Sequence, residues 1–247
     1  MKYVVVTGAS KGIGKAIAES FLRREKCGLA LTYNTDYEGV RDIAEKLALE
    51  GFFVLPVKMD VSNEDDVKRA FEYIYECFPR IDVLINNAGI SLVKSFYETT
   101  FDDWKKIIDV DLNGVYLTTK QVIDKMNTNE FGVIFNVSSV WGEVGASCEV
   151  AYSAAKSGVI GFTKALAKEY DLSIKAISVG FVDTTMNSHM SDEDVKAFLK
   201  ENPRIKLRSP AYAAKKILNF LDKEILKVEN GYYLSNDKKD NVILRIW

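Results

Sequence analysis

The sequence predicts an α/β fold built on a mostly parallel sheet. Two observations support this class: short apolar runs alternate with helical patterns along the chain, and a glycine-rich turn follows the first run. Such alternation is typical of βαβ units, whose right-handed crossovers place parallel strands in one sheet. The chain has 247 residues and no internal repeat, low-complexity linker or break in composition. We therefore expect one domain over residues 1–247.

Seven short apolar runs are the candidate strands: residues 3–7, 29–33, 53–57, 83–86, 133–137, 174–179 and 232–234. Between them, apolar residues recur at helical spacing within 40–49 and 67–78, which indicates surface helices with one buried face. Ser62 and Asp65 resemble a capping box at the start of the second of these helices.

Two longer helices are expected over about residues 101–126 and 150–170. The second contains small residues, among them Gly158 and Gly161. Because glycine inside a helix costs about 0.5–1 kcal/mol relative to alanine, a packing role is expected for these positions. Small residues let another helix approach closely, and that helix could belong to the same subunit or to another.

The composition argues against several classes of function. A formal net charge of −2 gives no overall attraction to nucleic acid or to an anionic membrane. No run approaches the ~20 apolar residues of a transmembrane helix, and the first strand is shorter than a signal-peptide core. The cysteines (Cys27, Cys77, Cys148) lack metal or redox spacing and His189 is the single histidine, so no metal site is expected. We expect a cytoplasmic protein.

The turn after the first strand is a candidate phosphate-binding element. A glycine-rich turn lets the backbone approach a pyrophosphate, and the helix that follows supplies N–H donors and a favourable dipole. The spacing Gly-x-x-x-Gly-x-Gly differs from both the common dinucleotide fingerprint and the P-loop. A tight structural turn is the alternative. Its place at the first strand–helix junction favours a binding role for Gly8, Ser10, Lys11, Gly12, Ile13 and Gly14.

A tyrosine and a lysine one helical turn apart are the candidate catalytic pair. Tyr152 and Lys156 lie four residues apart, and Ser139 precedes the tyrosine by thirteen. A phenol has an ordinary pKa of about 10. A lysine on the same helix face favours the phenolate and is expected to lower that pKa. The pair therefore predicts a tyrosine that transfers protons, although Tyr-x-x-x-Lys alone is common on helices.

Together these motifs resemble the short-chain dehydrogenase/reductase family, from Val4 to about Leu234. Asp60-Val61, the run Asn86-Asn87-Ala88-Gly89 and Asn113 add to the resemblance in order and spacing. It implies a single-domain Rossmann fold: a doubly wound, mostly parallel seven-stranded sheet with helices on both faces. It also implies a nicotinamide cofactor, hydride transfer to a carbonyl carbon, and a homo-oligomer, either a dimer or a tetramer.

The resemblance also assigns roles to residues. Ser139 would orient the carbonyl, Tyr152 would donate its proton, Lys156 would tune the tyrosine and bind the nicotinamide ribose, and Asn113 would hold a relay water in a disturbed helix. For Asn87, a purely structural role is the alternative to direct contact with the cofactor. Further cofactor contacts are implied for Asp60, Val61, Asn87, Ala88, Gly89, Val182 and Thr184.

Charge after the second strand predicts the choice of cofactor. An acid at the end of that strand binds the ribose hydroxyls of NAD and repels the 2′-phosphate of NADP. Here Asn34 and Thr35 follow the strand, and the first acid is Asp36. Lys11 in the glycine turn could pair with a 2′-phosphate. We expect NADP (NADPH) over NAD, with a contribution of Asp36 to ribose binding left open.

Within the family, the chain most resembles the beta-ketoacyl-acyl-carrier-protein reductases. This implies a 3-oxoacyl group on acyl carrier protein as substrate and a role in fatty acid biosynthesis. A dehydrogenase of a sugar, polyol, steroid or small ketone is the alternative. A non-catalytic cofactor-binding sensor is disfavoured because the four catalytic residue types are all present.

Three segments stand out against the family pattern. Val179 replaces the proline that precedes a glycine in most relatives, and Asp237-Lys238-Lys239 replaces Asp-Gly-Gly. Residues 185–209 resemble a substrate lid but indicate no substrate class. The apolar ending at residues 242–247 is expected to pack on the sheet edge or on a neighbouring subunit, because its tryptophan carries a large apolar area.

Overall fold

The computed structural model describes residues 1–129, 131–187, 191–201, 203, 205–229 and 242–247. Its centre is a seven-stranded sheet in the order β3-β2-β1-β4-β5-β6-β7, and every strand pair is parallel. The strand order reverses between β1 and β4, which lie side by side. The predicted doubly wound α/β sheet is confirmed.

The strands are β1 (Tyr3–Val6), β2 (Gly28–Tyr33), β3 (Phe53–Lys58), β4 (Val83–Asn86), β5 (Val133–Ser139), β6 (Ser173–Val179) and β7 (Ile243–Ile246). The first six coincide with predicted runs. The strand predicted at 232–234 lies outside the described residues. Among the described residues, the tail supplies the seventh strand. β7 pairs with β6 from Ala176 opposite Ile243 to Val179 opposite Ile246. The tail therefore packs on the sheet edge, as one of the two alternatives predicted.

The helices are α1 (Gly12–Ser20), α2 (Tyr37–Leu49), α3 (Glu64–Cys77), α4 (Phe101–Ile108), α5 (Gly114–Thr128), α6 (Trp141–Val144), α7 (Val150–Glu169), α8 (Asp192–Glu201) and α9 (Pro210–Glu229), with 3₁₀ turns η1 (Phe21–Arg23) and η3 (Thr185–Asn187). The single helix predicted over 101–126 is interrupted by a π-helical turn, η2 (Asp109–Asn113). Gly158 of α7 packs against Leu112 of this turn, so its close contact is internal.

The start of α3 differs from the prediction. Asn63 is the N-cap, and its side chain accepts a hydrogen bond from the Asp66 N–H at 3.0 Å. The Ser62 hydroxyl turns back and donates to Asp60 at 2.6 Å. The predicted capping box of Ser62 and Asp65 is therefore wrong, because the Ser62 hydroxyl is committed to the preceding loop.

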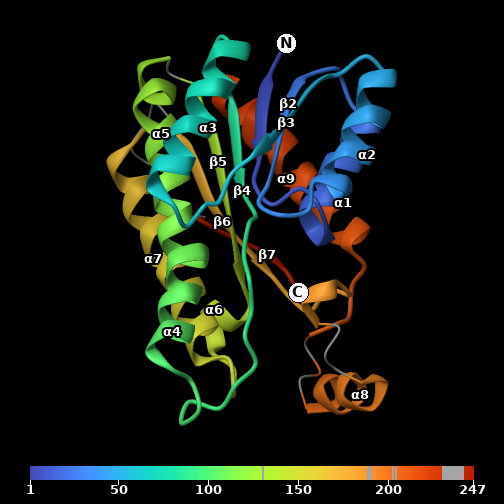
Figure 1. The fold of residues 1–247 in the computed structure, drawn as a ribbon, viewed down its shortest axis with the longest axis vertical. Helices are drawn as coiled ribbons and strands as arrows, with labels where there is room; N and C mark the ends of the chain where they lie inside the picture. Colours follow the sequence, from blue (N-terminus) through green and yellow to red (C-terminus); the bar gives the residue numbers. More distant parts are fainter. Residues whose placement is uncertain (130, 188–190, 202, 204, 230–241) are drawn as a thin grey trace.

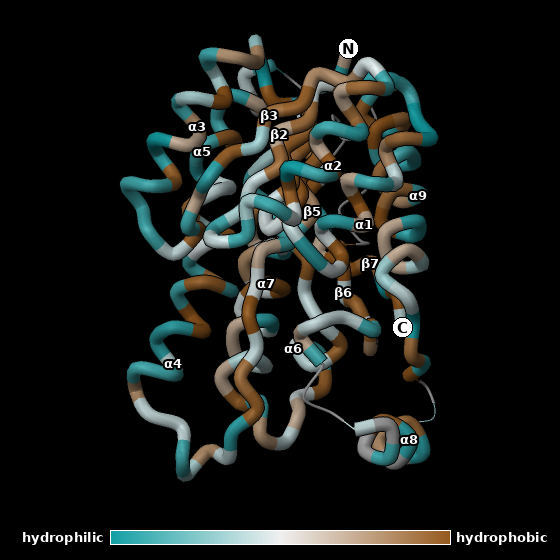
Figure 2. The backbone as a smooth tube through the Cα atoms, turned by 45° about the vertical axis from the view of Figure 1, so that its right-hand side comes forward, coloured by the Kyte–Doolittle hydropathy of each residue, from teal (hydrophilic) through white to brown (hydrophobic). Residues whose placement is uncertain are grey.

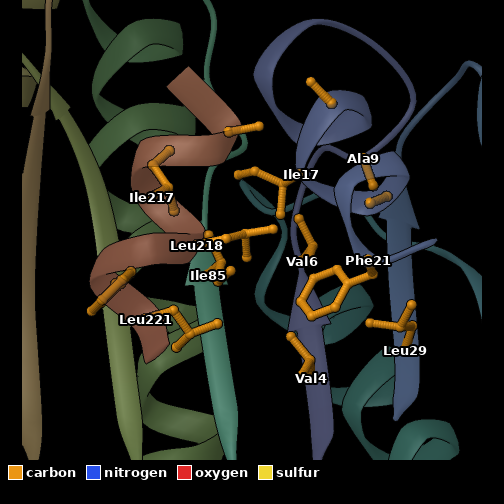
Figure 3. Close-up of a cluster of buried hydrophobic side chains, with 14 of the residues drawn as sticks. Val4, Val6, Ala9, Ile17, Phe21, Leu29, Ile85, Ile217, Leu218 and Leu221 are labelled. Atoms are coloured by element: carbon orange, nitrogen blue, oxygen red, sulfur yellow. The ribbon is translucent and has the colours of Figure 1, made fainter. Parts of the chain in front are cut away.

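Helices cover both faces of the sheet, with α1, α2 and α9 on one side and α3, α5 and α7 on the other (Figure 1). Figure 3 shows the first layer: Ile17 and Phe21 face Leu218 and Leu221 of α9 above the strands. All four side chains are buried. Burying apolar surface stabilises a fold by about 25 cal/mol per Å². The packing of these helices therefore stabilises the strands beneath them and holds the strand ends in place.

Hydropathy follows this layering. The central strands are largely brown and the outer helices alternate between brown and teal, because the strands are covered on both faces (Figure 2). Within the described part of the chain, none of the helices has the length and apolar character needed to span a bilayer.

Candidate active site

A cavity of about 880 Å³ lies at the carboxyl ends of the strands, where loops after β1, β4, β5 and β6 meet. Open α/β sheets bind ligands at this edge, where the strand order reverses. Two predicted site residues, Gly14 and Asn113, do not line the cavity. Those that do are Gly8, Ser10, Lys11, Gly12, Ile13, Asn34, Asp60, Val61, Asn87, Ala88, Gly89, Ser139, Tyr152, Lys156, Val182 and Thr184.

The glycine turn forms a cradle that side chains would fill. Gly8 has a φ of +64°, and a Cβ there would lie 2.8 Å from the Ala88 Cα. A Cβ on Gly14 would lie 2.5 Å from the Asn87 Nδ2 and closer still to the Gly8 carbonyl oxygen. Gly14 therefore lets the turn close instead of contacting the cavity. Because α1 begins at Gly12, its first N–H groups lie beside the cavity and favour an anionic group there.

Asn87 holds this turn against the end of β4. Its Nδ2 donates to the carbonyl oxygens of Thr7 at 3.0 Å and Gly8 at 3.1 Å. The Thr7 hydroxyl in turn accepts hydrogen bonds from the N–H groups of Asn87 and Ala88, both at 2.9 Å. The amide of Asn87 is thus committed to backbone groups, which favours the structural alternative for this residue.

Asp60 follows β3 and also lines the cavity. Its Oδ1 accepts hydrogen bonds from the N–H of Ser62 at 2.9 Å and from the Ser62 hydroxyl at 2.6 Å. The Asp60 N–H donates to Asp66 at 2.6 Å. Ser62 and Asp66 thus orient the loop so that Asp60 and Val61 line the cavity.

The acidic residue that follows β2 caps the N-terminus of α2. Asp36 is the N-cap of α2, and its carboxylate accepts a hydrogen bond from the Gly39 N–H at 3.0 Å. Asn34 and Lys11 are exposed and line the cavity. The acid is therefore directed at its own helix, while the cation in the glycine turn lies at the cavity rim.

Ser139, Tyr152 and Lys156 come together where β5 ends beside α7. The Lys156 Nζ lies 5.5 Å from the centre of the Tyr152 ring. It donates to the Val137 carbonyl at 3.2 Å, and the lysine is only 3% exposed. The Ser139 hydroxyl accepts a hydrogen bond from the Trp141 N–H at 3.2 Å. The lysine is thus fixed by the strand while the phenol and the serine face the cavity.

Asn113 is not brought to this group. It is exposed, and its Nδ2 donates to Asp109 at 2.9 Å. Asp111 lies there instead: it is fully buried, with its Oδ2 3.0 Å from the Lys156 Nζ and its Oδ1 accepting from the Ile90 N–H at 2.8 Å. Residues two apart on a helix point to nearly opposite sides, so the two side chains do not face the same site. The assignment of Asn113 as a catalytic residue is therefore corrected.

A signal for Asp111 was present in the sequence. Ile107, Asp111 and Val115 follow each other at intervals of four and are all buried. A carboxylate in line with apolar residues on a buried helix face needs a charged partner. Gly89 makes room for that partner, since a Cβ there would lie 2.8 Å from the Asp111 Oδ2 and 3.3 Å from the Lys156 Nζ.

The pair of Asp111 and Lys156 changes the expected titration of the tyrosine. Burial raises the pKa of Tyr152, Lys156 and Ser139 lower it, and Asp111 raises it again, so the net direction is upward. Burial lowers the pKa of Lys156, but Asp111 together with Tyr152 outweighs burial and raises it. The expected lowering of the Tyr152 pKa is therefore wrong, because burial of the phenol, together with Asp111, outweighs the effect of the lysine charge. Tyr152 retains its proton at neutral pH.

Glu149 is a cavity residue that the motifs did not indicate. It precedes Tyr152 by three residues, is partly buried, and lines the cavity. Burial raises the pKa of its carboxyl to about 7. A glutamate with this pKa changes its charge near neutral pH, beside the phenol.

Glu149→Gln is expected to flatten the dependence of stability on pH. The folded protein holds the Glu149 proton more tightly than the unfolded chain, so its contribution is fully present below about pH 4.5 and is lost as the pH rises through about 7. The difference in unfolding free energy between wild type and variant should change by on the order of 1–3 kcal/mol across this window. Urea titrations at pH 4.5, 6 and 8 measure it. Parallel curves for the two proteins would contradict the prediction.

Among the described residues, no group of three or more His, Cys, Asp or Glu side chains could hold a metal ion. The cradle at the glycine turn and the Tyr–Lys pair instead fit a dinucleotide at one end of the cavity and a reacting group at the other.

Comparison with known proteins agrees with this geometry. A family model described as short chain dehydrogenase matches residues 2–195. A 3-oxoacyl-(acyl-carrier-protein) reductase from Aquifex aeolicus is 33% identical over 94% of this chain and 97% of its own length. The corresponding reductase from Synechocystis is 36% identical over 79% of this chain and 80% of its own. Glucose 1-dehydrogenase 2 from Bacillus subtilis is 33% identical over 78% of this chain and 76% of its own.

The family match covers well over half of the chain, and its fold is the observed one. The chain therefore belongs to the short-chain dehydrogenase/reductase family and is an oxidoreductase that uses a nicotinamide cofactor to interconvert carbonyl and hydroxyl groups.

Proposed function

We propose that this protein is an NADPH-dependent reductase of 3-oxoacyl groups carried on acyl carrier protein. The observation that carries the reaction is the convergence of Ser139, Tyr152 and Lys156 in one cavity that the glycine-rich turn also lines. Two of the relatives named above are 3-oxoacyl-(acyl-carrier-protein) reductases, and they support the substrate class.

The reaction follows from what these side chains can do. The Ser139 hydroxyl donates to the carbonyl oxygen and orients it, and the protonated Tyr152 transfers its proton to that oxygen as negative charge develops. The fixed charge of Lys156 stabilises the phenolate that remains, and Asp111 holds the lysine in position. When bound, the reduced nicotinamide supplies the hydride to the carbonyl carbon. Asp111 replaces Asn113 in the proposed catalytic set.

The choice of NADPH is supported by the charges at the cavity rim. The Asp36 carboxylate is occupied by the N-terminus of α2, and Lys11 is exposed beside Asn34. A 2′-phosphate there would meet Lys11, and the carboxylate of Asp36, which also lines the cavity, is hydrogen-bonded to its own helix. The proposed contacts of the cofactor are the lining residues of the glycine turn together with Asn34, Asp60, Val61, Ala88, Gly89, Tyr152, Lys156, Val182 and Thr184.

Lys11→Ala should weaken NADPH binding about tenfold and leave NADH binding nearly unchanged, since one exposed charge pair with a phosphate is lost. Fluorescence titration with both reduced cofactors measures it. Lys15→Ala is the matched control, because it removes a cation from α1 that does not line the cavity. Equal weakening of both cofactors by Lys11→Ala, or tighter binding of NADH by the wild type, would refute the choice of NADPH.

A dehydrogenase of a sugar or polyol is the second candidate. Glu149 is the observation that favours it, since a carboxyl in the cavity could accept hydrogen bonds from substrate hydroxyls. The similarity to glucose 1-dehydrogenase 2 supports the same substrate class. A homo-oligomer is also proposed; Gly161 on α7 has open space in front of it, which would permit a helix of another subunit to approach.

A substrate panel tests the two functions. Acetoacetyl thioesters of acyl carrier protein and of a small thiol, a ketone and glucose are each assayed by absorbance of NADPH or NADH at 340 nm. We expect the carrier-bound thioester with NADPH to give the highest kcat/KM. Preferential oxidation of glucose would replace the first candidate by the second. No turnover with any substrate would overturn both.

A further inference from the structure

The end of the described chain is seated on the wall of the cavity. The Gly180 N–H donates to the Ile246 carbonyl at 3.2 Å, extending the ladder between β6 and β7. A Cβ on Gly180 would lie 2.5 Å from the Cβ of Trp247, so the tryptophan packs directly on this backbone. Gly180 and Phe181 line the cavity, whereas Trp247 does not. Trp247 therefore supports the wall from behind.

The carboxylate of Glu143 joins this tail to helix α6. Glu143 on α6 accepts hydrogen bonds from the Arg245 Nε at 2.8 Å, the Arg245 Nη2 at 2.6 Å and the Trp247 Nε1 at 3.3 Å. The loop from Ser139 into α6 is held by the Val140 N–H, which donates to the Val179 carbonyl at 2.9 Å. The indole is thus fixed in orientation, and not only by apolar packing.

Trp247 also belongs to an apolar cluster that reaches α8. The Phe198 ring of α8 lies 5.4 Å from Trp141 and 5.1 Å from Phe181, measured between ring centroids. In Figure 1, α8 lies beyond the end of the sheet, and the contacts of Phe198 with Trp141 and Phe181 join it to the body of the protein. The cluster, called here the aromatic wall, comprises Val140, Trp141, Phe181, Val195, Phe198, Leu199, Ile205 and Trp247.

We propose that Trp247, oriented by Glu143, is a positioning residue for the substrate half of the cavity. It holds Phe181 in place and, through the aromatic wall, fixes the position of α8 against the rest of the protein. Trp141 and Phe181 belong both to this wall and to the cavity lining, so movement of one changes the other. An apolar substrate chain would bind against these rings. The expected effect of Trp247 on KM rests on the proposed reductase function. Its expected effect on α8 rests on the contacts alone.

Trp247→Ala should raise the KM for the carbonyl substrate about tenfold while kcat changes less than about threefold, because the Tyr–Lys pair is untouched and substrate binding is weakened. Trp247→Phe keeps a ring on Gly180 but loses the donor to Glu143, and should give an intermediate KM. Glu143→Gln should shift KM in the same direction. Phe53→Ala is the matched control, since Phe53 is a partly exposed ring on β3, at the opposite edge of the sheet.

Hydrogen–deuterium exchange of α8, measured without substrate or cofactor, separates this inference from the proposed function. Exchange in α8 should be faster in Trp247→Ala than in the wild type and in Phe53→Ala. Absence of any carbonyl reduction by the wild type would refute the proposed function but leave this result intact. The positioning role would be overturned if α8 exchanged at the same rate in Trp247→Ala as in the wild type. The same KM in Trp247→Ala and Phe53→Ala would also overturn it.

Discussion

Tyr152→Phe is expected to lower kcat by about 10³-fold, while the dissociation constant of the reduced cofactor changes less than about threefold. The substitution removes only the phenolic hydroxyl. General acid catalysis contributes about 10²–10⁴-fold, and Tyr152 is the one phenol within reach of Ser139 and Lys156 among the described residues that line this end of the cavity. The ring remains to cover Lys156, so binding should survive. Single-turnover kinetics with the thioester and a parallel fluorescence titration separate the two quantities.

Tyr116→Phe is the matched control for this experiment. Tyr116 is half exposed on α5 and does not line the cavity. The substitution also removes one phenolic hydroxyl, but at a position away from the proposed proton donor. A kcat for Tyr152→Phe close to that of Tyr116→Phe would rule out Tyr152 as the proton donor.

Asp111→Ala is expected to lower the free energy of unfolding by about 3–5 kcal/mol, because it leaves the charge of Lys156 buried without its carboxylate. Asp111 is 0% exposed and Lys156 is 3% exposed, so the interaction lost is that of a buried charge pair. Asp111→Asn preserves the shape and the acceptor toward Ile90 and should lose less. Denaturant titration at pH 7 measures both. A loss below about 0.5 kcal/mol, typical of surface changes, would contradict a buried ion pair.

The same pair predicts a shift in the pH dependence of activity. Asp111 raises the pKa of Tyr152, so its removal should let Lys156 pull that pKa down. The limb of the kcat/KM profile that reports loss of the Tyr152 proton should therefore move to lower pH in Asp111→Asn. Asp109→Asn is the control: Asp109 lies in the same π-helical turn and also lines the cavity, but it pairs with Lys105 and not with Lys156. A shift of equal size in both variants would show that the turn, and not the charge of Asp111, is responsible.

The main errors of the sequence-based prediction fall where a side chain's direction mattered. Asn113 and Asp111 are two residues apart in one segment, and only the π-helical turn decides which of them faces Lys156. Ser62 and Asn63 are adjacent polar residues that could each begin α3; the Asp60 loop selects Asn63. The predicted direction of the Tyr152 pKa shift was wrong for a related reason, because the burial of the phenol and the charge of Asp111 come from elements far from α7 in the sequence.

The sequence by itself determined the class of this protein: the alternation of apolar runs and helical patterns, the glycine turn, Ser139 and the Tyr152–Lys156 pair specify a dinucleotide-binding α/β oxidoreductase. These features are local, since strand and helix periods and motif spacings depend on residues a few positions apart. The tertiary structure alone decided that Asp111 pairs with Lys156 and that Trp247 supports the cavity wall through Gly180. Both contacts join segments distant in the chain. They depend on packing and on the low polarity of the interior, which local pattern does not encode.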